Sequence, residues 1–130
     1  MSDGQMGKAV LVVEDEQVLR GALKEVLSKA GYGALEAADG EEGLKTALES
    51  RPNLILLDIM MLKMDGLAVL KALRQDAWGQ AAPIILLTVL EPDDKITQHI
   101  AEDKPACYLV KANWKLEDVV RKVKEAMDMR

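Results

Sequence analysis

Short apolar runs recur along the chain, separated by longer segments that mix apolar and polar residues. The runs are rich in Val, Ile and Leu, and most are continuous rather than alternating, which is typical of strands buried on both faces. We predict four such strands and a weaker fifth: Ala9–Val13, Leu54–Leu57, Ile84–Leu87, Cys107–Val110 and, less apolar, Tyr32–Ala37.

The segments between the runs carry apolar residues at the three- and four-residue spacing of amphipathic helices. The first, Gln17–Ala30, places its apolar residues, Val18 among them, on one predicted stripe, and Gly31 is expected to end it. Asp39 is placed to cap a second helix that ends before Pro52. Three more helices are predicted at Gly66–Arg74, after a cap at Asp93 or Asp94, and at Leu116–Met127.

This alternation of five strands with five helices predicts an α/β domain. Parallel strands need long right-handed crossovers, so the helices should cover both faces of a five-stranded parallel sheet. In such sheets ligands bind beyond the carboxyl ends of the strands. The residues that directly follow each strand are therefore the candidates for function.

A chain of 130 residues corresponds to one domain. Its polar start lacks the apolar core of a secretory signal and predicts a flexible tail over residues 1–7 before a domain at 8–130. No apolar run approaches the roughly 20 residues of a membrane span. Cys107 is the single cysteine, which favours a reducing compartment. We therefore expect a cytoplasmic protein without membrane insertion.

Composition argues against nucleic acid as a partner. The 17 basic and 22 acidic residues give a net charge of −5, whereas phosphate backbones select basic surfaces. There is no Phe, and two Trp and two Tyr cannot form a platform for stacked bases. His99 has no ligand partner at a useful spacing and is expected at the surface.

Charged or hydroxyl side chains follow four of the predicted strands. In chain order they are Glu14-Asp15-Glu16, Asp58, Thr88 and Lys111. Each alone is compatible with a helix cap, a strand-end hydroxyl or a solvated charge. Their joint placement at one edge of a sheet is much less expected by chance.

Asp58 interrupts a strongly apolar stretch, where a carboxylate is costly without a cationic partner. Lys111 can supply one positive charge, and a cluster of acidic oxygens also suits Mg²⁺. A carboxylate nucleophile, Mg²⁺, a hydroxyl and a lysine are the groups that phosphoryl transfer to an aspartate would use. Asp58 would attack phosphorus in line, while Mg²⁺, Thr88 and Lys111 neutralise the equatorial oxygens.

Four motifs at these strand ends resemble those of bacterial response-regulator receiver domains, over about residues 8–127. They are Val12-Val13-Glu14-Asp15-Glu16, Leu56-Leu57-Asp58-Ile59-Met60-Met61 with Met64-Asp65-Gly66, Leu86-Leu87-Thr88 and Tyr108-Leu109-Val110-Lys111. The resemblance implies the flavodoxin-like, doubly wound (βα)5 fold with strand order 2-1-3-4-5.

The resemblance also implies a magnesium site. Asp15 and Asp58 would bind the ion, the backbone carbonyl of Met60 would be a third contact, and Glu14 would contribute through water. No other cofactor is implied.

By the same resemblance, Asp58 is the phosphoacceptor and Lys111 the partner of the phosphate. Thr88 would be the switch hydroxyl and Tyr108 the switch aromatic. The protein would catalyse only its own aspartyl phosphorylation and dephosphorylation, and so would not be an enzyme in the usual sense.

Two departures from the family pattern concern prolines. Leu62 stands where a proline usually follows the phosphoacceptor, and Ala112 stands where a proline, often in a cis bond, follows the lysine. A cis bond before a non-proline residue costs about 2.5–4 kcal/mol. Either the loop at Lys111 stores that strain, or the bond is trans and the lysine reaches the site by another path. Val89 is bulkier than the residue often found after the switch hydroxyl.

The leading hypothesis is a stand-alone receiver of a two-component system or phosphorelay, a monomer or weak dimer. A histidine kinase or histidine phosphotransfer protein would supply the phosphoryl group. The output would be a protein target on the face formed by the fourth helix, fifth strand and fifth helix.

Two alternatives remain open at this point. One is a phosphorylation-independent interaction module whose site is impaired by Leu62 and Ala112. The other, less favoured, is a small Mg²⁺-dependent phosphatase, for which the sequence offers no substrate pocket signature.

Overall fold

The computed structural model describes residues 7–128 apart from 62, 90, 92 and 114. Residues 1–6 of the predicted tail, and the family departure at Leu62, therefore lie outside the described residues. Within them, no helix combines the length and the apolar character that a membrane crossing needs.

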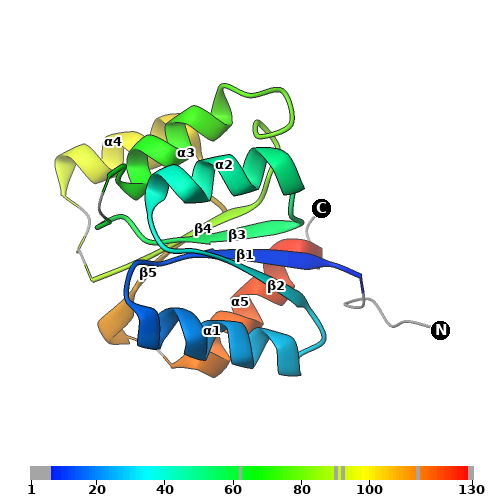
Figure 1. Ribbon diagram of the computed structural model, residues 1–130. Coiled ribbons are helices and arrows are strands. Elements are labelled where there is room, and N and C mark those ends of the chain that lie inside the picture. Colours follow the sequence, from blue (N-terminus) through cyan, green and yellow to red (C-terminus); the bar gives the residue numbers. More distant parts are fainter. Residues whose placement is uncertain (1–6, 62, 90, 92, 114, 129–130) are drawn as a thin grey trace.

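The five strands form one parallel sheet in the order β2-β1-β3-β4-β5, as predicted (Figure 1). Every neighbouring pair in the sheet is parallel. The strands are β1 (Ala9–Val13), β2 (Gly33–Ala37), β3 (Leu54–Leu57), β4 (Ile84–Thr88) and β5 (Cys107–Val110).

Helices cover both faces of the sheet, which confirms the predicted fold class. Figure 1 shows α2, α3 and α4 on one face and α1 with α5 on the other. Their bounds are α1 (Gln17–Lys29), α2 (Gly40–Ser50), α3 (Gly66–Arg74), α4 (Asp94–Asp103) and α5 (Leu116–Asp128). Where the sequence pattern predicted both ends of an element, each end is within one residue of the structure.

Alternate residues of each central strand enter two separate cores. In β1, Leu11 and Val13 pack beneath α2, α3 and α4, whereas Val10 and Val12 face α1 and α5. All four are at most 1% exposed. Burial of one such side chain contributes about 1.5–3 kcal/mol. Two covered faces explain why the apolar run is continuous.

Aspartates fix the starts of three helices at the carboxyl edge of the sheet. In each case the side chain accepts a hydrogen bond from the backbone N–H three residues later, an interaction that contributes about 1 kcal/mol. The pairs are Asp39 with Glu42 (2.8 Å), Asp65 with Ala68 (2.9 Å) and Asp93 with Ile96 (2.8 Å). Asp93, and not Asp94, is thus the cap of α4.

Two predictions about burial were wrong. Val18 was placed on the apolar stripe of the first helix, but it is 81% exposed. At about 100° per residue it lies roughly opposite the buried Leu27. His99 was expected at the surface, but its side chain is only 22% exposed, and its Nδ1 lies 3.5 Å from Oδ2 of Asp103 one turn later.

Candidate functional site

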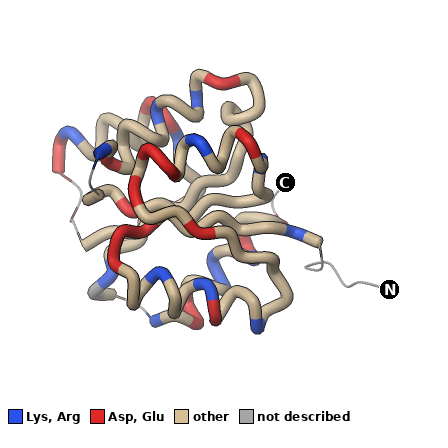
Figure 2. Tube along the Cα trace, in the orientation of Figure 1, with Lys and Arg blue, Asp and Glu red and all other residues tan. Residues whose placement is uncertain are grey.

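Three carboxylates converge where β1 and β3 end. Val13 pairs with Leu57 in the sheet register, so the residues that follow, Glu14 and Asp58, leave neighbouring strands side by side. One carboxylate oxygen each from Glu14, Asp15 and Asp58 lies within 4.8 Å of the others. Figure 2 shows several acidic (red) stretches of the chain at the left-hand end of the sheet.

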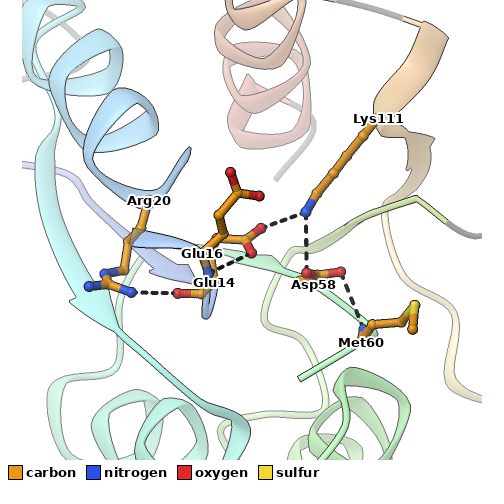
Figure 3. A network of polar contacts seen from close by, with 6 residues as sticks. All are labelled: Glu14, Glu16, Arg20, Asp58, Met60 and Lys111. Carbon is orange, nitrogen blue, oxygen red and sulfur yellow. Dashed lines mark hydrogen bonds and ion pairs between the residues drawn. The ribbon is translucent and has the colours of Figure 1, made fainter. Parts of the chain in front are cut away.

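Lys111 directly follows the edge strand β5, and its side chain extends to this cluster at the ends of β1 and β3. Its Nζ donates to Oε1 of Glu14 at 2.8 Å and to Oδ2 of Asp58 at 3.2 Å (Figure 3). The lysine is the first residue of a short 3-10 turn, Lys111–Asn113. No cis peptide bond occurs in the described part of the chain. A lysine without a following proline therefore still reaches both carboxylates.

Both of these carboxylates are buried, Glu14 at 2% and Asp58 at 5% exposed. Burial is the main cause that raises the pKa of Glu14 to about 7, and the charge of Asp58 adds to the effect, while the Lys111 hydrogen bond opposes it. Burial by itself would lower the pKa of Lys111. The hydrogen bonds and charges of Glu14 and Asp58 outweigh it, so this pKa lies above its usual value.

Lys111 thus contacts two of three clustered acidic side chains, and the cluster holds more acidic groups than cations. A cavity of about 490 Å³ opens beside them and is lined on its polar side by Asp15, Asp65, Asp93 and Lys95. Hard divalent cations prefer carboxylate oxygens, and Mg²⁺ is commonly held by one or two carboxylates with several waters. Exposed Asp15 next to two buried carboxylates is a donor set that suits such an ion.

The loop after Asp58 is folded tightly back onto it. The N–H of Gly66 donates to the carbonyl of Ile59 at 2.9 Å, and a Cβ on Gly66 would clash with the carbonyl oxygen of Asp58. Only glycine fits there. The backbone N–H of Met60 donates to Oδ1 of Asp58 at 3.3 Å. A role for the Met60 carbonyl as a metal ligand stays a prediction.

Thr88 lies on β4 and Tyr108 on β5, the two strands that follow β3 in the order of the sheet. Thr88 is the last residue of β4 and is fully buried. Tyr108 in β5 is half-buried beside Leu86 of β4. Burial, followed by the charges of Asp93, Glu91 and Asp58, raises its pKa. Thr88 thus lies at the carboxyl edge of the sheet, and Tyr108 lies two residues before the end of its strand.

The polar network includes one residue that the sequence reasoning missed. Nη1 of Arg20 in α1 donates to the carbonyl oxygen of Glu14 at 2.8 Å (Figure 3). Glu16, predicted among the acidic candidates, contributes its backbone N–H, which donates to Oε2 of Glu14 at 3.1 Å. Arg20 stands at a polar position of the predicted helix. The helical pattern therefore did not indicate that its side chain bonds to a residue before the helix.

A doubly wound parallel sheet with an acidic pocket and a lysine at its carboxyl edge defines a receiver-type signalling domain. Residues 10–124 match the response regulator receiver domain, and the chain belongs to this family. Receiver domains act in two-component systems, where accepting a phosphoryl group is their general function. They are signalling proteins and not enzymes in the usual sense.

The chain is similar to the alkaline phosphatase synthesis transcriptional regulatory protein PhoP of Bacillus subtilis. The two are 42% identical over 92 residues, which are 70% of this chain and 38% of PhoP. The probable transcriptional regulator ycf27 of Cyanophora paradoxa is 45% identical over 91 residues, 69% of this chain and 37% of that protein. The chain thus spans less than two fifths of the length of these relatives.

Among solved structures, the chemotaxis response regulator CheY4 of Vibrio cholerae superposes with a TM-score of 0.83 at 30% identity. The match covers 94% of this chain and 99% of that one. The fold of CheY4 therefore extends over nearly the whole of this chain.

Proposed function

We propose that this chain accepts a phosphoryl group on Asp58 from a phosphohistidine of a histidine kinase or phosphotransfer protein. The observation that carries the proposal is that Asp58 is a nearly buried carboxylate held by Lys111 beside two further acids. A buried carboxylate in an acidic pocket favours the binding of a cation such as Mg²⁺. In a receiver domain, that arrangement supports aspartyl phosphorylation.

In the proposed reaction a carboxylate oxygen of Asp58 attacks phosphorus in line. The P–O bond to Asp58 forms as the P–N bond to the donor imidazole breaks, and the imidazole leaves and takes up a proton. Bound Mg²⁺ would supply charge neutralisation for the transferring phosphoryl oxygens. Asp15 and Asp58 would hold the ion, the Met60 carbonyl would add a third contact, and Glu14 would act through water.

Lys111 is proposed to change partners during this step. In the absence of phosphate its ammonium pairs with Glu14 and Asp58. A phosphoryl group on Asp58 presents new anionic oxygens within reach of the same ammonium. Lys111 would then neutralise one equatorial oxygen, and the buried hydroxyl of Thr88 would donate to another.

The output is proposed to pass through Thr88 and Tyr108. If Thr88 is drawn towards the phosphate, the space beside β4 changes, and the half-buried ring of Tyr108 can turn inward. The face formed by α4, β5 and α5 would then present a different surface to a protein target. A cytoplasmic location belongs to the same proposal, because the lone Cys107 suits a reducing compartment.

Incubation with acetyl phosphate and Mg²⁺, followed by intact-mass measurement, tests this proposal. We expect one added phosphoryl group in the wild type and none in Asp58→Asn or in wild type with excess EDTA. Asp39→Asn is the matched control, since Asp39 caps α2 and is not among the described residues that line the cavity beside the acidic cluster. A phosphoryl group that persists in Asp58→Asn would refute the assignment.

The same measurement separates the proposal from a phosphorylation-independent interaction module. An unmodified wild type that also takes up no Mg²⁺ in calorimetry would favour the module. Phosphorylation of the wild type at Asp58 would rule it out as the explanation of the site.

A further inference from the structure

The side chain of Arg20 connects the metal-site loop to the edge of the sheet. Its Nη1 donates to the carbonyl oxygen of Glu14 at 2.8 Å, and its Nε lies 3.4 Å from Oε1 of Glu36 in β2. The arginine side chain is only 17% exposed although it carries a full charge. A guanidinium with several directional donors can serve both partners at once.

The carbonyl oxygen of Glu14 belongs to the peptide plane that joins Glu14 to Asp15. Because this plane is rigid, a bond that fixes its oxygen also fixes the direction in which the chain enters Asp15. The backbone N–H of Arg20 additionally donates to the carbonyl of Glu16 at 2.9 Å. Arg20 therefore holds the loop on both sides of Asp15, through its side chain before it and its backbone after it.

Asp15 most needs such support. Unlike Glu14 and Asp58, it is exposed, so packing does not restrict its backbone in the way that burial restricts the other two acids. Partners that orient a metal ligand without touching the metal commonly change affinity by about 10- to 100-fold when removed. The contact from Arg20 is of this kind.

We propose that Arg20 is a positioning residue for Mg²⁺ binding, acting through the carbonyl of Glu14 to hold Asp15 towards Asp58. This inference rests on the proposed function, in which Asp15 and Asp58 hold Mg²⁺ and Glu14 acts through water. The ion is held without any contact from the arginine itself.

Electrostatics and positioning predict opposite signs when Arg20 is removed. The guanidinium is a cation near a cation site, so its charge alone disfavours Mg²⁺, and its loss would tighten binding. Loss of a positioning contact instead weakens binding. The direction of the change therefore separates the two roles.

Two further residues of the network provide matched controls. Lys24, one turn after Arg20 in α1, also pairs with Glu36 at 3.1 Å, and the structure gives it no contact with Glu14. Lys24→Ala thus removes one positive charge and one Glu36 ion pair. Glu36→Gln weakens both ion pairs while the Arg20–Glu14 bond remains.

The experiment is calorimetric titration of Mg²⁺ into the metal-free protein at a temperature where circular dichroism shows each variant folded. We expect Arg20→Ala to bind about tenfold or more weakly, Arg20→Lys to recover part of the loss through its ammonium group, and Lys24→Ala and Glu36→Gln to stay near the wild type. Hydrogen exchange of the metal-free protein should be faster over residues 14–19 in Arg20→Ala, relative to the same segment in Lys24→Ala.

Unchanged or tighter Mg²⁺ binding by Arg20→Ala would overturn the inference, and so would equal weakening in Glu36→Gln. If Arg20→Ala does not fold, the comparison of Arg20→Lys with Lys24→Ala decides, since Arg20→Lys must then be the weaker binder. Absence of Mg²⁺ uptake by the wild type would instead refute the proposed metal site, so the two failures are distinguishable.

Discussion

The ammonium of Lys111 lies 2.8 Å from a carboxylate oxygen of Glu14, although 97 positions separate the two residues in the chain. The carboxylate is almost fully buried, and the same ammonium also bonds to Asp58. The three groups form one coupled charge cluster. Changing Lys111 or Asp58 should therefore alter the pKa of Glu14 and the stability of the folded protein.

Removal of the lysine should destabilise the metal-free protein most at high pH. In Lys111→Met, two buried carboxylates lose their cation, and we expect a loss of about 3–5 kcal/mol in the free energy of unfolding at pH 8. The loss should shrink at pH 5, because Glu14 can take up a proton. Urea unfolding with EDTA present measures both values. Lys115→Met, at an exposed position nearby, is the control and should change little.

The pKa of Glu14 predicts a pH dependence of stability with a definite sign. A carboxyl group whose pKa is about 7 in the folded protein and near 4.5 when unfolded holds its proton more tightly when folded. Its stabilising contribution is therefore present below pH 4.5 and is lost as the pH rises through 7.

The variant Glu14→Gln lacks this titration. Its free energy of unfolding, relative to that of the wild type, should rise by about 2–3 kcal/mol between pH 4 and pH 8 in metal-free buffer. Urea unfolding at four pH values across this range measures the difference. A flat difference would show that Glu14 does not titrate in this window.

Two glycines should respond to alanine with opposite signs. Gly66→Ala brings a Cβ into the Asp58 carbonyl oxygen, so the loop must move, and we expect a loss of a few kcal/mol together with weaker Mg²⁺ binding. Gly21 lies inside α1, where an added Cβ would have nothing within 4 Å, and Gly21→Ala should stabilise by about 0.5–1 kcal/mol. Thermal unfolding of both variants tests the pair.

The exposed Val18 should tolerate a charge. We expect Val18→Lys to change stability by less than about 0.5 kcal/mol, whereas Leu27→Ala on the buried side of the same helix should cost about 2–5 kcal/mol. Urea unfolding of the two variants distinguishes the faces. A large loss in Val18→Lys would contradict the orientation of α1.

The fold could be predicted from the sequence because its signals are local. Continuous apolar runs such as Leu54–Leu57, and aspartates placed before helical periods, give strands and helices whichever way they later pack. Because strands and helices alternate along the chain, the favoured arrangement is a parallel sheet with helices on both faces. Parallel strands have their carboxyl ends at one edge of the sheet. The sequence pattern therefore predicts that Asp58 and Asp15, which follow two such strands, lie close together.

The tertiary structure alone decided the relationships that depend on how the helices pack against the sheet. The periodicity of α1 could not show that Val18 faces outward, because the helix has more apolar residues than its contact surface with the sheet can bury. Likewise, Arg20 can donate to the Glu14 carbonyl only when α1 packs on the sheet in one orientation about its own axis. The raised pKa of Glu14 arises from burial, and burial exists only once the helices and the sheet have packed together.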